Sequence, residues 1–133
     1  MFRLFLLAFL VASFVGCSTG RYPATGIVHY PDGAPVEAGT VIAEAKVNGE
    51  LVGVQANIEK DGSFKLGGAV PGDGALPGSY RAMVMPVTLG DSEIAAGMTP
   101  AVASKYANIE TSGISFEIKP QENKLDIEVT KPK

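Results

Sequence analysis

The chain has 133 residues, of which 46% are hydrophobic and 19% are charged, with a formal net charge of -3. Its basic side chains are scattered among acidic ones, which excludes nucleic-acid binding because phosphate contacts require clustered lysine and arginine. The 16 glycines and 9 prolines imply many turns, and together with segments rich in valine and isoleucine they predict an all-β domain.

The chain opens with an apolar leader. Residues 4–15 are almost entirely apolar and follow a single charge, Arg3. This stretch suits a secretory leader and is shorter than the roughly 17–25 residues of a membrane span. Residues 14–17 (FVGC) then place the only cysteine, Cys17, directly after a small residue. The pattern resembles a bacterial lipoprotein signal, in which cleavage leaves an acylated cysteine as the first residue.

We therefore expect a signal peptide at residues 1–16 and attachment to a membrane through lipid on Cys17. Acylation also explains why an exported chain has a single cysteine, which would otherwise be a free thiol, and two or three acyl chains anchor stably. Ser18 after the cysteine favours the outer membrane of the bacterial cell envelope, on its periplasmic face or at the cell surface. The alternatives are an ordinary secretory signal with a chance cysteine, or a buried helix, which no cap or polar face supports.

After the leader, residues 17–25 are predicted to be a lipidated tether and residues 26–133 a single domain. The first strand is expected at residues 26–30, and the next two at residues 40–47 and 51–58. Asn48-Gly49 between these two is the strongest hairpin signal in the chain. A shorter strand is expected at residues 63–66.

The second half of the domain contains three further predicted strands. Residues 79–87 are apolar on both faces, which is typical of a central strand. Residues 114–119 and 125–130 each alternate apolar and polar side chains, and a turn at residues 120–123 predicts that they form a closing hairpin. The resulting expectation is a seven-stranded antiparallel β-sandwich of immunoglobulin-like architecture.

Between these strands, residues 88–113 have weak strand character. Loops of this length in a compact domain are usually functional or disordered, and this one is too apolar for disorder. We expect it to pack across one sheet edge, with a helical turn near residues 92–97. Its candidate contact residues are Met98, Lys105 and Tyr106, and for Tyr106 the alternative is a structural role at a corner of the sandwich.

Several turn and core motifs are similar to those of a known family. Residues 26–28 (GIV) and 32–36 (DGAPV), with 61–66 (DGSFKL) and 77–80 (PGSY), resemble carboxypeptidase regulatory-like domains, which are transthyretin-like β-sandwiches. Residues 105–114 and the closing strands resemble small surface lipoproteins of planctomycetes. The resemblance implies a non-catalytic module that acts as a stalk, a spacer or a binding domain.

The sequence predicts no metal site and no cofactor. Zinc requires three or four Cys, His or carboxylate ligands, and the chain has one histidine, His29, and one cysteine. Residues 57–62 match the first half of a calcium loop, but the position that should hold a bidentate glutamate is Gly68. We expect His29 to be a structural or solvated residue.

No catalytic residue is predicted either. The segment Gly78-Ser79-Tyr80 lacks the elbow glycine of the G-x-S-x-G motif around a serine nucleophile. Asp126 and Glu128 are two acidic residues on the solvent-facing side of a strand, where charged side chains are expected without any catalytic role. The leading hypothesis is therefore a lipid-anchored, non-catalytic module that binds an envelope protein or gives structural support. The alternative is a module that binds a glycan or another small ligand, although the chain has no tryptophan to serve as a sugar platform.

Overall fold

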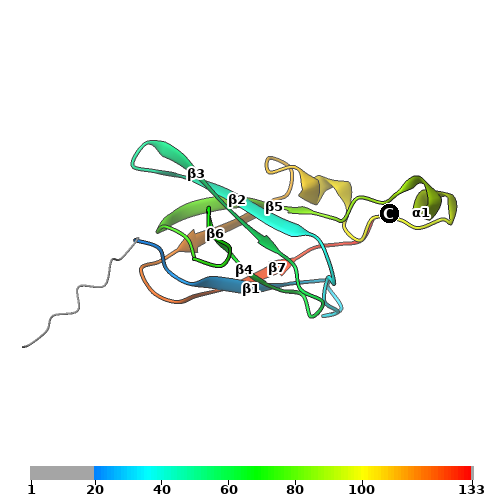
Figure 1. Cartoon of the computed structure of the whole chain (residues 1–133), viewed down its shortest axis with the longest axis horizontal. Helices are drawn as coiled ribbons and strands as arrows, with labels where there is room; N and C mark the ends of the chain where they lie inside the picture. The colour runs from blue at the N-terminus through cyan, green and yellow to red at the C-terminus, as the bar shows by residue number, and fades with distance from the viewer. Residues whose placement is uncertain (1–19, 133) are drawn as a thin grey trace, which may run out of the picture.

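The computed structural model describes residues 20–132, which form two β-sheets (Figure 1). The four-stranded sheet has the order β3-β2-β5-β6, and the three-stranded sheet has the order β4-β1-β7. The prediction of an all-β domain with seven strands is confirmed for these residues. The strands are β1 (Ala24–His29), β2 (Thr40–Val47), β3 (Glu50–Asn57), β4 (Ser63–Lys65), β5 (Gly78–Met85), β6 (Ile114–Ile118) and β7 (Asn123–Glu128).

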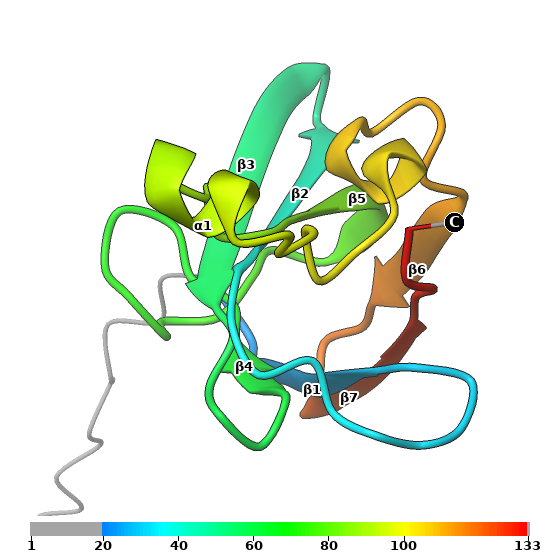
Figure 2. The same ribbon diagram turned by 90° about the vertical axis from the view of Figure 1, so that its right-hand side faces the viewer.

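The core lies between the two sheets, which face each other in Figure 2. It forms because alternate residues of each strand turn to the same side. The central strand β5 shows this clearly: Tyr80, Ala82 and Val84 are almost fully buried, whereas Arg81 and Met85 on the other face are exposed. From the other sheet, apolar side chains such as Phe64 complete the interior.

The β2–β3 hairpin follows directly from its turn residues. A two-residue turn between right-handed twisted strands requires positive φ at both positions, which asparagine and glycine tolerate best. Asn48 has φ 52° and Gly49 has φ 81°. Val47 and Glu50 close the turn, and the ladder continues to the pair of Thr40 with Asn57.

The expectation that all neighbouring strands are antiparallel is wrong at one place. β1 and β7 are parallel, in register from Ala24 with Asn123 to His29 with Glu128. The first and last strands of the domain therefore lie side by side (Figure 2). All other strand pairs are antiparallel.

The predicted closing hairpin is also wrong, because β6 and β7 belong to different sheets. The cause is the buried side chain of Asn123. Its Oδ1 accepts a hydrogen bond from the Lys119 N–H at 2.9 Å, and its Nδ2 donates to the Gln121 carbonyl at 2.7 Å. These bonds hold the connection in a shape that carries the chain from one sheet to the other.

The folded body begins before residue 26, inside the segment predicted to be a tether. β1 starts at Ala24, and Tyr22 exchanges two main-chain hydrogen bonds with Ala75, at 2.9 and 3.0 Å. Arg21 donates from Nη1 to the Gly74 carbonyl at 3.0 Å. The C-terminal part of the predicted tether, from Arg21 onward, therefore belongs to the folded body.

Candidate functional site

The base of the 88–113 loop is fixed to the body. Val102 and Tyr106 are buried, at 1% and 6% exposure. The Ala103 N–H donates to the Thr130 carbonyl at 2.8 Å, and the Tyr30 hydroxyl donates to the Ala101 carbonyl at 2.7 Å. The buried Ser112 hydroxyl donates to the carbonyl of Ala82 in β5. The loop base is therefore held to the body by contacts with Tyr30, Ala82 and Thr130.

The loop tip, residues 91–101, is exposed throughout. It begins with the short helix α1 (Asp91–Ala95), close to the predicted helical turn. The helix starts because the Gly90 N–H donates to the Glu93 carboxylate at 2.7 Å, which satisfies a main-chain donor that has no partner within the helix. None of the residues of α1 is buried, and Ile94 is 59% exposed.

Of the three predicted contact residues of this loop, Met98 and Lys105 are exposed and Tyr106 is buried. Met98 is 52% exposed, in the loop tip, four residues after Ile94 and beyond the end of α1. Lys105 is exposed at the loop base, with its Nζ 4.8 Å from the centre of the Tyr106 ring. Tyr106 is buried among the core residues, so it does not serve as a surface contact residue, and the structural alternative fits its position. It lies in a 3-10 turn, η1 (Ser104–Ala107), that packs on β5.

A second polar feature lies on the outer face of the three-stranded sheet, where His29 contacts Asp126. The ring Nε2 of His29 pairs with the Asp126 carboxylate, and its Nδ1 lies 2.8 Å from the Tyr30 carbonyl oxygen. Both partners are acceptors, so the ring can donate to both of them only when both nitrogens carry a proton and the imidazole is positively charged. The hydrogen bond to Tyr30 and the one to Asp126 accordingly raise the pKa of His29.

We expect this charged pair to make stability depend on pH. Because the pKa of His29 is raised on folding, its contribution is present below about pH 6.5 and is lost as the pH rises through the folded-state pKa. His29→Gln should lower the free energy of unfolding by about 0.2–1 kcal/mol at pH 5.5, as for other solvated ion pairs, and by less at pH 8.5. Urea unfolding of both proteins at the two pH values measures the difference, and an equal loss at both would contradict the assignment.

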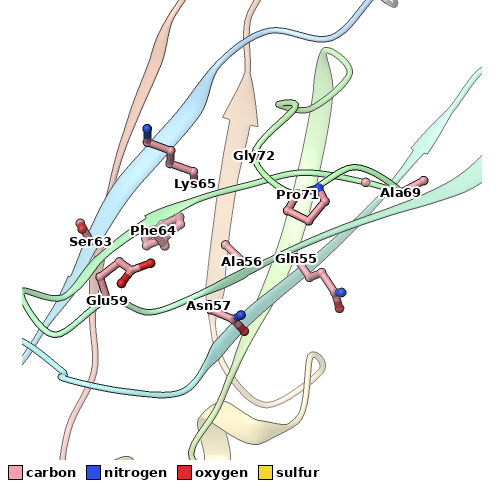
Figure 3. Close-up of a pocket in the computed structure, with 11 residues that line it drawn as sticks. Gln55, Ala56, Asn57, Glu59, Ser63, Phe64, Lys65, Ala69, Pro71 and Gly72 are labelled. Atoms are coloured by element: carbon pink, nitrogen blue, oxygen red, sulfur yellow. The ribbon is translucent and has the colours of Figure 1, made fainter.

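A cavity of about 510 Å³ opens where β3 and β4 separate (Figure 3). Gln55 exchanges main-chain hydrogen bonds with Gly67, and the same register would next pair Asn57 with Lys65. β4 instead pairs with β1, so the outward N–H and C=O groups of these two residues have no main-chain partner within residues 20–132. The lining is Gln55, Ala56, Asn57, Glu59, Ser63, Phe64, Lys65, Gly68, Ala69, Pro71 and Gly72.

The remaining predicted site, Cys17, lies outside the described residues. Within residues 20–132, no helix is long and apolar enough to cross a membrane. The same stretch contains no group of three or more His, Cys, Asp or Glu side chains placed to hold a metal ion. The chain matches no protein-family model and no curated protein. The resemblance to carboxypeptidase regulatory-like domains therefore stays a prediction.

Proposed function

We propose that the chain is a lipid-anchored, non-catalytic module of the bacterial envelope that binds a partner protein through its loop tip. The observation that carries this proposal is the exposure of residues 91–101, which include the apolar side chains of Ile94 and Met98. These two exposed apolar side chains lie four residues apart on one loop, and exposed apolar surface is typical of contact sites where it forms a patch. The loop tip, which carries α1, lies at the opposite end of the molecule from the N-terminal end of the described chain, so N-terminal anchoring would present it outward (Figure 1).

The charge of the loop indicates what kind of partner it fits. Asp91 and Glu93 are the only charged residues in residues 86–104. An apolar patch beside two carboxylates complements an apolar pocket with lysine or arginine at its rim, and it is repelled by a membrane surface of anionic lipid. The same segment has no aromatic residue on which a sugar ring could stack. A protein partner is therefore favoured over a lipid surface or a glycan.

The motif resemblance supports a sandwich of the transthyretin-like type for the body that carries this loop. The loop itself has two parts. Its base is anchored by the buried residues Val102 and Tyr106, whereas residues 91–101 stay outside the core. In this proposal the two sheets are a scaffold, and recognition belongs to the loop tip.

A second candidate function is the binding of a small polar ligand in the cavity between β3 and β4. The observation that favours it is the pair of unsatisfied main-chain groups at Asn57 and Lys65, beside the apolar walls of Ala56 and Phe64. A ligand with its own donor and acceptor would satisfy these groups. This function would be independent of Ile94 and Met98.

The test of the proposed function is photo-cross-linking of the full chain in its own membranes, with a photoreactive residue at position 98. We expect one recurrent protein partner. Ile94→Lys should reduce its capture about tenfold or more, because full burial of such a side chain contributes about 1.5–3 kcal/mol and 1.4 kcal/mol is a factor of ten.

Val70→Lys is the matched control, since Val70 is 60% exposed but lies in another loop. It should leave capture unchanged. Equal capture of the partner by the Ile94→Lys chain would show that the loop tip does not carry the recognition, and would shift support to the cavity.

A further inference from the structure

The outer edge of β3 has main-chain groups with no main-chain partner among residues 20–132. In β3, the residues that hydrogen-bond to β2 alternate with residues whose N–H and C=O groups point away from it. Gln55 belongs to the outward set, because its bonds go to Gly67 on the other side. Leu51 and Gly53 share this orientation, and within residues 20–132 their outward groups have no main-chain partner.

This edge also lacks the residues and strand irregularities that usually prevent another strand from pairing with an exposed edge. Exposed edges are commonly blocked by proline, lysine or a bulge. β3 has neither proline nor lysine, and its ladder with β2 runs without interruption from Glu50 to Asn57. Its one charged residue, Glu50, is at the hairpin end. The open edge at Leu51 and Gly53 is therefore free to accept another strand.

Beside this edge the side chain of Leu51 projects into solvent, and Gly53 leaves an open space that we call the notch. Leu51 is 65% exposed, the most exposed of the large apolar side chains within residues 20–132. Gly53 lies two residues away on the same outer face of the sheet, and a Cβ added there would meet only the Ala43 carbonyl oxygen, at 3.9 Å. Glycine inside a strand often marks a place where another backbone comes close.

We propose that this edge binds the same edge of a second copy of the chain, in an antiparallel arrangement about a two-fold axis at Val52. In this register Leu51 lies opposite the partner's Gly53, and Gly53 lies opposite the partner's Leu51. Both are hydrogen-bonded pairs, because all the residues concerned have outward N–H and C=O groups. Each leucine fits the space above the other copy's glycine, so the surface is self-complementary, as a two-fold interface requires.

The chain itself limits the length of this new ladder. Gln55 already bonds to Gly67, so the pairing stops after Gly53. No charged side chain lies among residues 51–53, and the two copies of Glu50 are at opposite ends of the pairing. The contact is short, and we expect reversible association. It lies on the body of the domain, so it does not depend on the function proposed for the loop tip.

The experiment is oxidative cross-linking of the full chain in membranes, with cysteine at position 52. Val52 points its main-chain groups toward β2, so across the new interface it forms a non-hydrogen-bonded pair with the partner's Val52. Such pairs have Cα atoms about 4.5 Å apart, within the roughly 4.4–6.8 Å that a disulfide spans. Val52→Cys should therefore give a reducible dimer, whereas Val70→Cys and the wild-type chain, whose only cysteine is Cys17, give the background level.

A second substitution separates this contact from chance encounters. Adding Gly53→Val to the Val52→Cys chain fills the notch, and the open space at Gly53 allows the domain to fold. Dimer yield should fall to the background level, with an unchanged melting temperature. Leu51→Lys should act in the same way. The proposal is overturned if Val52→Cys gives no dimer above background, or if the yield survives both added substitutions.

Discussion

Phe64→Ala is expected to lower the free energy of unfolding by about 3–5 kcal/mol, the usual range for truncating a fully buried phenylalanine. Phe64 is 2% exposed, and it belongs to β4, the shortest strand of the domain. Its ring packs tightly on the neighbouring strand: a Cβ built on Gly26 would fall 2.6 Å from the ring Cζ. Truncation would leave a void between the sheets, and it would also enlarge the cavity beside β3.

Urea unfolding measures this loss, and two variants calibrate it. Val70→Ala, at an exposed loop position, should change stability by no more than about 0.5 kcal/mol. Phe116→Ala should have an intermediate effect, because Phe116 is only half-buried and stacks on Tyr80 with ring centres 5.7 Å apart. A loss at Phe64 no larger than the roughly 1 kcal/mol of an average substitution would mean that β4 does not close the core as described.

Cys17→Ala is expected to abolish incorporation of labelled palmitate into the chain. The reason is chemical, since Cys17 is the only thiol of the sequence and hence the only side chain that can be the acylated cysteine. Labelling of the wild-type and variant full-length chains, followed by immunoprecipitation, measures the effect. The melting temperature of the domain should not change, because the buried apolar core of the described residues runs from Ala24 to Val129 and Cys17 lies outside it.

Ser18→Ala is the control for this experiment and should keep the label. A wild-type chain without label would favour the ordinary secretory signal, in which the cysteine stands near the cleavage position by chance. Label that persists in Cys17→Ala would contradict the lipoprotein assignment itself. Either result would leave the proposal that the loop tip binds a partner intact. It would remove the lipid anchor that, in this proposal, holds the domain so that the tip points outward.

The positions of the strands were predictable because side-chain alternation is a local property. Residues 40–47 and 114–118 are strands as predicted, the second ending one residue early. The Asn48-Gly49 turn was also predictable, since few other residue pairs adopt positive φ at both positions. Local chemistry determines such features, and no knowledge of distant residues is needed.

The partner of the last strand was not predictable from the same pattern. Alternation in β7 shows which side chains face the core, and it gives no information on whether β6 or β1 lies alongside. That choice depends on the connection shaped by Asn123, whose amide bonds Lys119 and Gln121. In the sequence, asparagine before a strand indicates only an ordinary turn.

The same limit explains what was missed among the candidate site residues. Residues 88–113 were predicted as a contact loop from their length, yet an irregular segment has no period that separates inward from outward side chains. For this reason the sequence could not decide between a contact role and a structural role for Tyr106, which is buried, whereas Met98 is exposed as a contact residue must be. The contact of His29 with Asp126 spans 97 positions and exists only because β1 and β7 are parallel neighbours.

The placement of β1 between β4 and β7 has a mechanical consequence. A pull on the loop tip, resisted at the N-terminal end of the described chain, would act roughly along β1 (Figure 1). Hydrogen bonds between strands are directed sideways from the strand, so those on both flanks of β1 would be strained in shear, together. They would share the tension instead of opening one after another as in peeling. Tension between the loop tip and the N-terminal end would therefore be resisted without drawing out the first strand.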